Sequence, residues 1–219
     1  NKDQQMDPAS ITKVMTAMVA LDSGKRLDDV CTLSEISYQS DAQVANIKTG
    51  DTLTLRQLLM IMLIFSANDA ADNVALAVSS SKDAFVNAMN DKAREIGMWD
   101  SVFLDPTGLS ASNVSTARDL ALLVARSARY PEIRRFSVAS QLQVRTAYGT
   151  RVFHTTNPLV GNQQWGLTVQ KTGFINEAGN CVVMQARVNG RQMIIVLLDS
   201  QGRYSRVADA NRIRRFLEG

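Results

Sequence analysis

The segment DPASITKVMTAMVALDSG, residues 7–24, sets the centre of the predicted fold. Asp7 and Pro8 are typical of a helix start, with Asp7 as the cap and Pro8 at the first helical position. Because Ala17, Val19 and Ala20 are apolar as well as the residues at helical spacing, we expect this helix to be buried on most sides. The spaced apolar residues and the glycine that ends the pattern are Ile11, Val14, Met15, Met18, Leu21 and Gly24.

The same segment places Ser10 three residues before Lys13. Residues i and i+3 share a helix face, so the lysine amine can approach the serine hydroxyl. At a buried helix start, desolvation and nearby positive charge would lower the pKa of the amine, and a neutral lysine could act as a base toward serine. Chance gives roughly 0.6 such spacings in this composition. A second copy, Ser79 with Lys82, follows a helical pattern, and we interpret it as a solvated turn.

Few other routes to hydrolytic chemistry remain in this composition. The 219 residues include one histidine, His154, and two cysteines, Cys31 and Cys181. These side chains cannot form a zinc site from His and Cys alone, and no serine lies in a G-x-S-x-G motif. We therefore expect the base to be a lysine or a carboxylate, predict no metal and no cofactor, and interpret His154 as a structural residue near a sheet.

The two cysteines leave two interpretations open. Cys31 and Cys181 could form one disulfide in an oxidising compartment, but the apolar strand pattern around Cys181 favours a buried free thiol. The polar start, residues 1–5, is not a signal peptide, so we expect an export leader to lie outside the given sequence. No run reaches the ~18 apolar residues of a membrane span, and we predict none.

The net charge is +3, and arginines gather along one segment. A nucleic-acid-binding face is one interpretation, but no nucleic-acid module accompanies these charges. We favour a solvated surface with some attraction for anionic substrates, and we expect no nucleic-acid partner. The arginines are Arg126, Arg129, Arg134, Arg135, Arg145 and Arg151.

Helical patterns dominate the middle of the chain, and strand patterns follow. Thr54 with Gln57 predicts a capping box ahead of an apolar helix. The Asn189-Gly190 pair predicts a hairpin turn. The predicted helices cover residues 55–65, 67–78, 84–96, 116–128 and 205–217, and the predicted strands cover 167–171, 181–188 and 192–198.

These elements predict an α+β fold, an antiparallel sheet flanked by helices with an all-helical lobe inserted. We assign residues 1–30 and 135–219 to the lobe that contains the sheet. Residues 31–134 form the helical lobe.

Two further motifs complete a set with the Ser10–Lys13 pair. Ser66-Ala67-Asn68 follows an apolar helix and opens another, although roughly 1.1 such spacings arise by chance. Lys171-Thr172-Gly173 ends a strand pattern, where Gly173 would let a substrate backbone approach; roughly 0.02 copies are expected by chance. Its second copy, Lys48-Thr49-Gly50, leads into a polar helix cap, and we interpret it as a surface turn.

Together, the motifs resemble a known family. DPASITK (7–13), SANDAA (66–71) and KTGF (171–174) occur in the order of the serine penicillin-binding proteins and β-lactamases. The closest likeness is to the low-molecular-mass D-alanyl-D-alanine peptidases, and within them to the endopeptidases. Further matching segments are DPTGL (105–109), NVSTARDL (113–120) and EAGNCVVM (177–184).

The resemblance implies a role for each motif residue. Ser10 would attack a D-Ala carbonyl while Lys13 takes its proton. Ser66 would relay that proton toward the leaving amine, Asn68 would hold Lys13 and the substrate amide, and Lys171 would supply positive potential beside Ser66.

The resemblance also implies a substrate-binding strand. Thr172 would bind the substrate's carboxylate or its equivalent, and Gly173 would admit the substrate backbone. Backbone N–H groups of Ser10 and Phe174 would form the oxyanion hole. We expect the fold of serine β-lactamases and DD-peptidases, with edge strands that precede residue 7 in the family absent from this sequence.

The implied function is cleavage of peptidoglycan peptide cross-links by an exported, periplasmic enzyme that β-lactams acylate, and we expect a monomer. Carboxypeptidase relatives place an arginine shortly before the KTG strand, where this chain has Thr156; this difference favours an endopeptidase over a carboxypeptidase. A β-lactamase would need a glutamate with asparagine four residues on. Neither Glu95 nor Glu132 has one. An inactive peptidoglycan-binding module is the remaining alternative.

Overall fold

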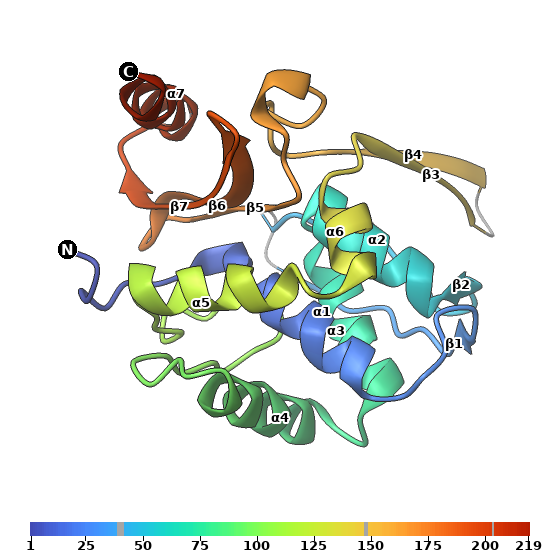
Figure 1. Ribbon diagram of the computed structural model, residues 1–219. Helices are drawn as coiled ribbons and strands as arrows, with labels where there is room; N and C mark the ends of the chain where they lie inside the picture. Colours follow the sequence, from blue (N-terminus) through green and yellow to red (C-terminus); the bar gives the residue numbers. More distant parts are fainter. Residues whose placement is uncertain (39–41, 147–148, 203) are drawn as a thin grey trace.

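The computed structural model describes residues 1–38, 42–146, 149–202 and 204–219. Helix α1 (Thr12–Asp22) lies at the centre, and every side chain from Thr12 to Ala20 is buried (Figure 1). This confirms the predicted core helix. Because it is apolar on nearly all sides, it is held by neighbours all round it rather than along one stripe.

The predicted start of this helix is wrong in one respect. The α-helix begins at Thr12, after a 3-10 turn, η1 (Ala9–Ile11), so Pro8 is not its first residue. The reason is the backbone of Ala9, whose φ of +46° lies in the left-handed region and cannot continue an α-helix. Asp7 still acts locally, since its Oδ1 accepts the Ala9 N–H at 2.7 Å.

Four helices pack against α1 as the helical patterns predicted, each within about two residues of its expected bounds. They are α2 (Leu55–Phe65), α3 (Asn68–Val78), α4 (Lys82–Glu95) and α5 (Ala117–Ser127). The Thr54–Gln57 capping box is confirmed in both directions. Ahead of α2, the short strands β1 (Val30–Cys31) and β2 (Leu53–Thr54) pair antiparallel.

The main sheet is antiparallel, with the order β5-β6-β7. The strands are β5 (Val169–Ile175), β6 (Gly179–Val188) and β7 (Arg191–Ser200). Asn189 and Gly190 make the β6–β7 turn with φ of +47° and +73°, which confirms the predicted hairpin. Helix α7 (Ser205–Glu218) covers one face of the sheet, and α5 lies on the other (Figure 1). The mixed α+β prediction is therefore confirmed.

A short helix and a second hairpin were not expected. Helix α6 (Pro131–Ser137) and the hairpin of β3 (Gln141–Thr146) and β4 (Gly149–His154) both pack against α2. Another short turn, η2 (Gln163–Trp165), leads toward β5. His154 is exposed at the end of β4, where it pairs with Gln141 of β3, so it belongs to this second hairpin rather than to the main sheet.

Both cysteines are free and buried, which agrees with the interpretation of a buried free thiol rather than a disulfide. Over the described residues, no helix combines the length and apolarity that crossing a bilayer requires. The division into a sheet lobe and a helical lobe stays a prediction.

Candidate active site

Ser10 and Lys13 meet at the start of the central helix. The 3-10 turn carries Ser10 and the first α-helical turn carries Lys13, so the i, i+3 spacing puts both on one face. Lys13 Nζ lies 2.8 Å from Ser10 Oγ, 2.7 Å from Asn68 Oδ1 and 2.6 Å from the Thr107 carbonyl oxygen. The amine is fully buried, whereas Ser10 keeps partial exposure. A reagent can therefore reach the hydroxyl but not the amine.

Burial lowers the pKa of Lys13 to about 7, although Asp105, Asp72 and Asp69 act in the opposite direction. A neutral amine has two N–H groups and one lone pair. The Asn68 and Thr107 oxygens can only accept, so they take the two N–H groups. The lone pair then faces Ser10 Oγ, and the serine O–H becomes the donor. This arrangement can remove a proton from Ser10.

Ser66 and Asn68 lie at the junction between α2 and α3. Ser66 ends α2 with a left-handed φ of +65°, and Asn68 is the first residue of α3. Asn68 N–H donates to the Gln43 carbonyl at 2.8 Å. The carboxylate of the next residue, Asp69, accepts from Ala45 N and Ile47 N at 2.8 and 2.9 Å. This junction is therefore tied to residues 43–47, which hold both side chains in place.

Lys171 joins the site from strand β5. Its fully buried amine donates to Ser66 Oγ at 2.7 Å and to the Thr172 carbonyl at 2.9 Å. Burial, followed by the positive charges of Lys13 and Arg206, sets the pKa of Lys171 well below its usual range. Two buried amines are thus close enough for the charge of Lys13 to act on Lys171, and Lys171 holds the Ser66 hydroxyl beside them.

Gly173 brings β5 close to the 3-10 turn that carries Ser10. A Cβ at this position would lie 3.0 Å from the Pro8 carbonyl oxygen and 3.2 Å from Ser10 N. Main-chain groups alternate between the two edges of a strand. Since the Gln170 N–H points to Ser137 of α6, away from β6, the N–H of Phe174, four residues further on, points to that same edge. Phe174 itself has an exposed side chain.

Thr172 has an unexpected neighbour in Thr156. Their hydroxyl oxygens lie 2.6 Å apart, and Thr156 N–H donates to the Ile64 carbonyl at 3.2 Å. The position where the resemblance placed an arginine in carboxypeptidases therefore faces the KTG strand directly, and here it holds a small neutral side chain.

Sequence reasoning missed the contribution of Asp105 and Thr107. The Asp105 carboxylate accepts the N–H groups of Thr107 and Gly108 at 2.9 and 3.0 Å and Asn113 Nδ2 at 2.6 Å. Burial raises the pKa of Asp105, but hydrogen bonds from Thr107 and Asn113 outweigh it, so the net pKa is lowered. The turn presents the Thr107 carbonyl to Lys13. The sequence signals were the likeness of DPTGL (105–109) to the family and an Asp two residues before Thr-Gly, which is typical of such turns.

The same turn explains the strained backbone beside Ser10. Gly108 has a φ of +82°, and a Cβ there would lie 2.0 Å from the Ala9 carbonyl oxygen. Only glycine permits this approach, which presses the turn against the left-handed Ala9.

The second copies of two motifs lie elsewhere, as expected. Lys82 pairs with Asp72 at 2.8 Å and is partly exposed, and Lys48 pairs with the exposed Glu35. The structure thus brings together Ser10, Lys13, Ser66, Asn68 and the KTGF segment and separates these from their copies. Across the described part of the chain, no three His, Cys, Asp or Glu side chains gather as they would around a metal ion.

Comparison with known proteins agrees with this geometry. Residues 1–202 match the peptidase family S11, described as D-alanyl-D-alanine carboxypeptidase. A Pseudomonas aeruginosa protein named D-alanyl-D-alanine endopeptidase is 42% identical, over 100% of this chain and 71% of the relative. An Escherichia coli protein of the same name is 37% identical, over 96% of this chain and 69% of the relative.

Solved structures show the same fold. The Streptomyces K15 DD-transpeptidase superposes with a TM-score of 0.91 at 28% identity, covering 98% of this chain and 88% of that one. Penicillin-binding protein D2 of Listeria monocytogenes, in its cefotaxime-bound form, gives 0.85 at 29% identity, with the same two coverages. The predicted DD-peptidase-like fold is therefore confirmed.

Proposed function

The chain belongs to the D-alanyl-D-alanine carboxypeptidase family S11 and is a serine D-Ala-D-Ala peptidase, and from this premise we propose that it hydrolyses peptidoglycan cross-links as an endopeptidase. The observation that carries the catalytic part is the contact of fully buried Lys13 with Ser10. The choice of an endopeptidase rests on Thr156 and on the names of the two relatives.

Ser10 is the nucleophile in this proposal, and Lys13 is its base. With Asn68 and Thr107 holding its N–H groups, neutral Lys13 accepts the Ser10 proton as Oγ attacks a D-Ala carbonyl. Ser66, held by Lys171, passes the proton to the leaving nitrogen, and Lys171 keeps the potential there positive. Water then hydrolyses the acyl-enzyme.

The free edge of β5 binds the substrate backbone as an added strand. Gly173 allows the close approach, and Thr172 donates a hydrogen bond to the distal carboxylate or the carbonyl in its place. The N–H groups of Ser10 and Phe174 stabilise the oxyanion, with each donor contributing about 3–4 kcal/mol in sites of this kind. Asn68 binds the substrate amide.

β-Lactams acylate the same serine in this account, since their strained amide mimics the D-Ala–D-Ala bond. The cefotaxime-bound state of the Listeria neighbour supports the idea. Peptidoglycan lies outside the cytoplasmic membrane, so the enzyme works in the periplasm, and we expect it to act as a monomer.

Thr156 favours cross-links over free chain ends. A terminal D-Ala ends in a carboxylate, which a cation beside Thr172 would bind. Here Thr156 and Thr172 offer only hydroxyl groups. Cleavage of an internal bond does not depend on recognising a chain-terminal carboxylate, because the chain continues into the partner stem peptide, whose polar groups can hydrogen-bond to two hydroxyl groups. The D-alanyl-D-alanine carboxypeptidase activity is the second candidate, because the family description carries that name.

Thr156→Arg should shift the enzyme toward carboxypeptidase activity. We expect the release of free D-Ala from a pentapeptide to rise about tenfold relative to dimer cleavage, because a guanidinium beside Thr172 can bind the carboxylate. Chromatography of both products measures the ratio. The control Thr150→Arg adds the same charge at an exposed site on β4 and should leave the ratio unchanged. An unchanged ratio in Thr156→Arg would remove the specificity argument.

The acylation rate should follow the ionisation of Lys13. Below its pKa of about 7 the amine is protonated and cannot accept the serine proton, so the rate falls as the pH drops. We expect the second-order rate constant with a fluorescent penicillin to rise about tenfold per pH unit below pH 7 and to level off above it. A rate constant independent of pH between 5 and 8 would contradict this assignment.

Digestion of defined muropeptides tests the proposed function. A cross-linked dimer should yield monomers, and a pentapeptide monomer should release little D-Ala. Ser10→Ala should do neither. If the enzyme released D-Ala from monomers and left dimers intact, the endopeptidase proposal would be wrong and carboxypeptidase activity would take its place.

A further inference from the structure

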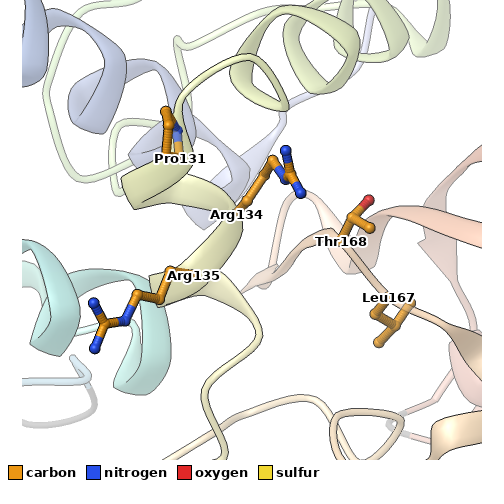
Figure 2. Close-up of a pocket in the computed structure, with 5 residues that line it drawn as sticks. All are labelled: Pro131, Arg134, Arg135, Leu167 and Thr168. Atoms are coloured by element: carbon orange, nitrogen blue, oxygen red, sulfur yellow. The ribbon is translucent and has the colours of Figure 1, made fainter.

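A pocket of about 320 Å³ lies outside the site built around Ser10. Helix α6 forms one wall and the residues just before β5 form the other (Figure 2). Arg134 reaches from α6 toward Thr168, whereas Arg135 points to the other side of the helix. The lining residues are Pro131, Arg134, Arg135, Leu167 and Thr168.

The pocket is separate from the site around Ser10. Ser137, at the end of α6, covers the edge of β5 at Gln170: Gln170 Nε2 donates to the Ser137 carbonyl at 2.6 Å, and Gln170 N donates to Ser137 Oγ at 3.4 Å. Lys171 and the other proposed catalytic groups lie on the far side of this Ser137–Gln170 contact. A ligand bound in the pocket would therefore be a part of the substrate that lies away from the bond being cleaved.

Positive charge in this region is not neutralised within the described chain. Arg134 and Arg135 are exposed, and their side chains make no hydrogen bond or ion pair with a described residue. Between residues 120 and 176, Glu132 is the only acidic residue, beside six arginines. Of those six, Arg126 pairs with Glu95, and Arg151 bonds to backbone carbonyls. The guanidinium of Arg134 thus gives the pocket a strong donor that no described carboxylate pairs with.

Resting on the proposed function, we infer that this pocket binds a carboxylate of a neighbouring stem peptide in polymeric peptidoglycan. The substrate is a polymer whose stem peptides carry free carboxylates, and a planar guanidinium is the side chain that binds them best. Arg134 supplies the charge from α6. The Thr168 hydroxyl, which donates to Gln185 Oε1 at 2.7 Å, still has lone pairs for water or an N–H of the ligand. The pocket holds the enzyme on the polymer while the site around Ser10 cleaves one cross-link.

Sedimentation with purified, protein-free sacculi tests the inference. Ser10→Ala serves as the parent protein, so that the polymer is not digested during binding. Adding Arg134→Glu should weaken binding about tenfold. The control Arg191→Glu makes the same charge change at an exposed arginine on β7 and should stay within about twofold of the parent. Arg134→Glu should unfold at the parent's temperature, since Arg134 is exposed.

A second arm tests the carboxylate itself. Sacculi whose carboxyl groups have been amidated should bind the parent about tenfold more weakly, with no further loss for Arg134→Glu. Short DNA should not compete. Equal binding of Arg134→Glu and the parent to native sacculi, no effect of amidation, or competition by DNA would each overturn the inference. Dimer digestion by the protein that keeps Ser10 does not depend on these binding results. The proposed function therefore stands even if this inference fails.

Discussion

Replacing Lys13 by methionine should slow acylation by benzylpenicillin between 10²-fold and 10⁴-fold, the range that general-base catalysis contributes. Methionine keeps most of the length and volume of a side chain that is fully buried at the start of α1. It has no lone pair of comparable basicity, so the Ser10 proton loses its acceptor. The rate constant for adduct formation, followed by intact-protein mass spectrometry, measures the effect.

The matched control for this variant is Lys82→Met. Lys82 also follows a serine by three residues, but it pairs with Asp72 and stays partly exposed. Its replacement should leave acylation unchanged. Lys13→Met should also lose the rise in rate around pH 7, a readout that simple loss of packing would not change. A variant acylated at the wild-type rate would show that another group is the base.

Ser10→Ala should abolish covalent attachment and lower dimer cleavage by at least 10⁴-fold, as removal of a nucleophile does in serine hydrolases. The Ala9 turn, Gly108 and β5 remain, so the site should still bind a β-lactam, although no covalent bond forms. Equilibrium dialysis with a labelled penicillin separates binding from acylation. Ser79→Ala, in the second copy of the motif, should react normally. A covalent adduct on Ser10→Ala would place the nucleophile elsewhere.

Local sequence signals predicted those parts of the fold that local chemistry determines. The Thr54–Gln57 cap starts α2 where two side chains satisfy the first amides. Asn189 and Gly190 turn the β6–β7 hairpin because both tolerate positive φ. The Ser10–Lys13 contact follows from helical spacing alone. For the distant partners Ser66 and Lys171, only the resemblance indicated that they would meet.

Other features depend on contacts between distant segments, which no local pattern reveals. Ala9 adopts a left-handed backbone, and Gly108 packs against its carbonyl oxygen, so the start of α1 shifts to Thr12. The pKa of Lys13 falls because several helices exclude water from it. Helix α6 is only seven residues long, too short for a clear periodic signal.

Asp105 shows how a functional contribution escapes sequence reasoning. Its side chain makes no hydrogen bond with Ser10 or Lys13; it shapes the turn that presents the Thr107 carbonyl, and its charge raises the pKa of Lys13. A main-chain acceptor leaves no mark in the identity of its own residue. Only the geometry shows that Lys13 depends on it.

The site of β-lactam attachment tests the central claim most directly. Wild-type protein treated with benzylpenicillin and digested after quenching should carry one penicilloyl group on the peptide that contains Ser10, and the peptide that contains Ser79 should be unmodified. An unmodified Ser10 peptide, or an adduct on any other serine, would contradict the assignment of Ser10 and Lys13 as the catalytic pair.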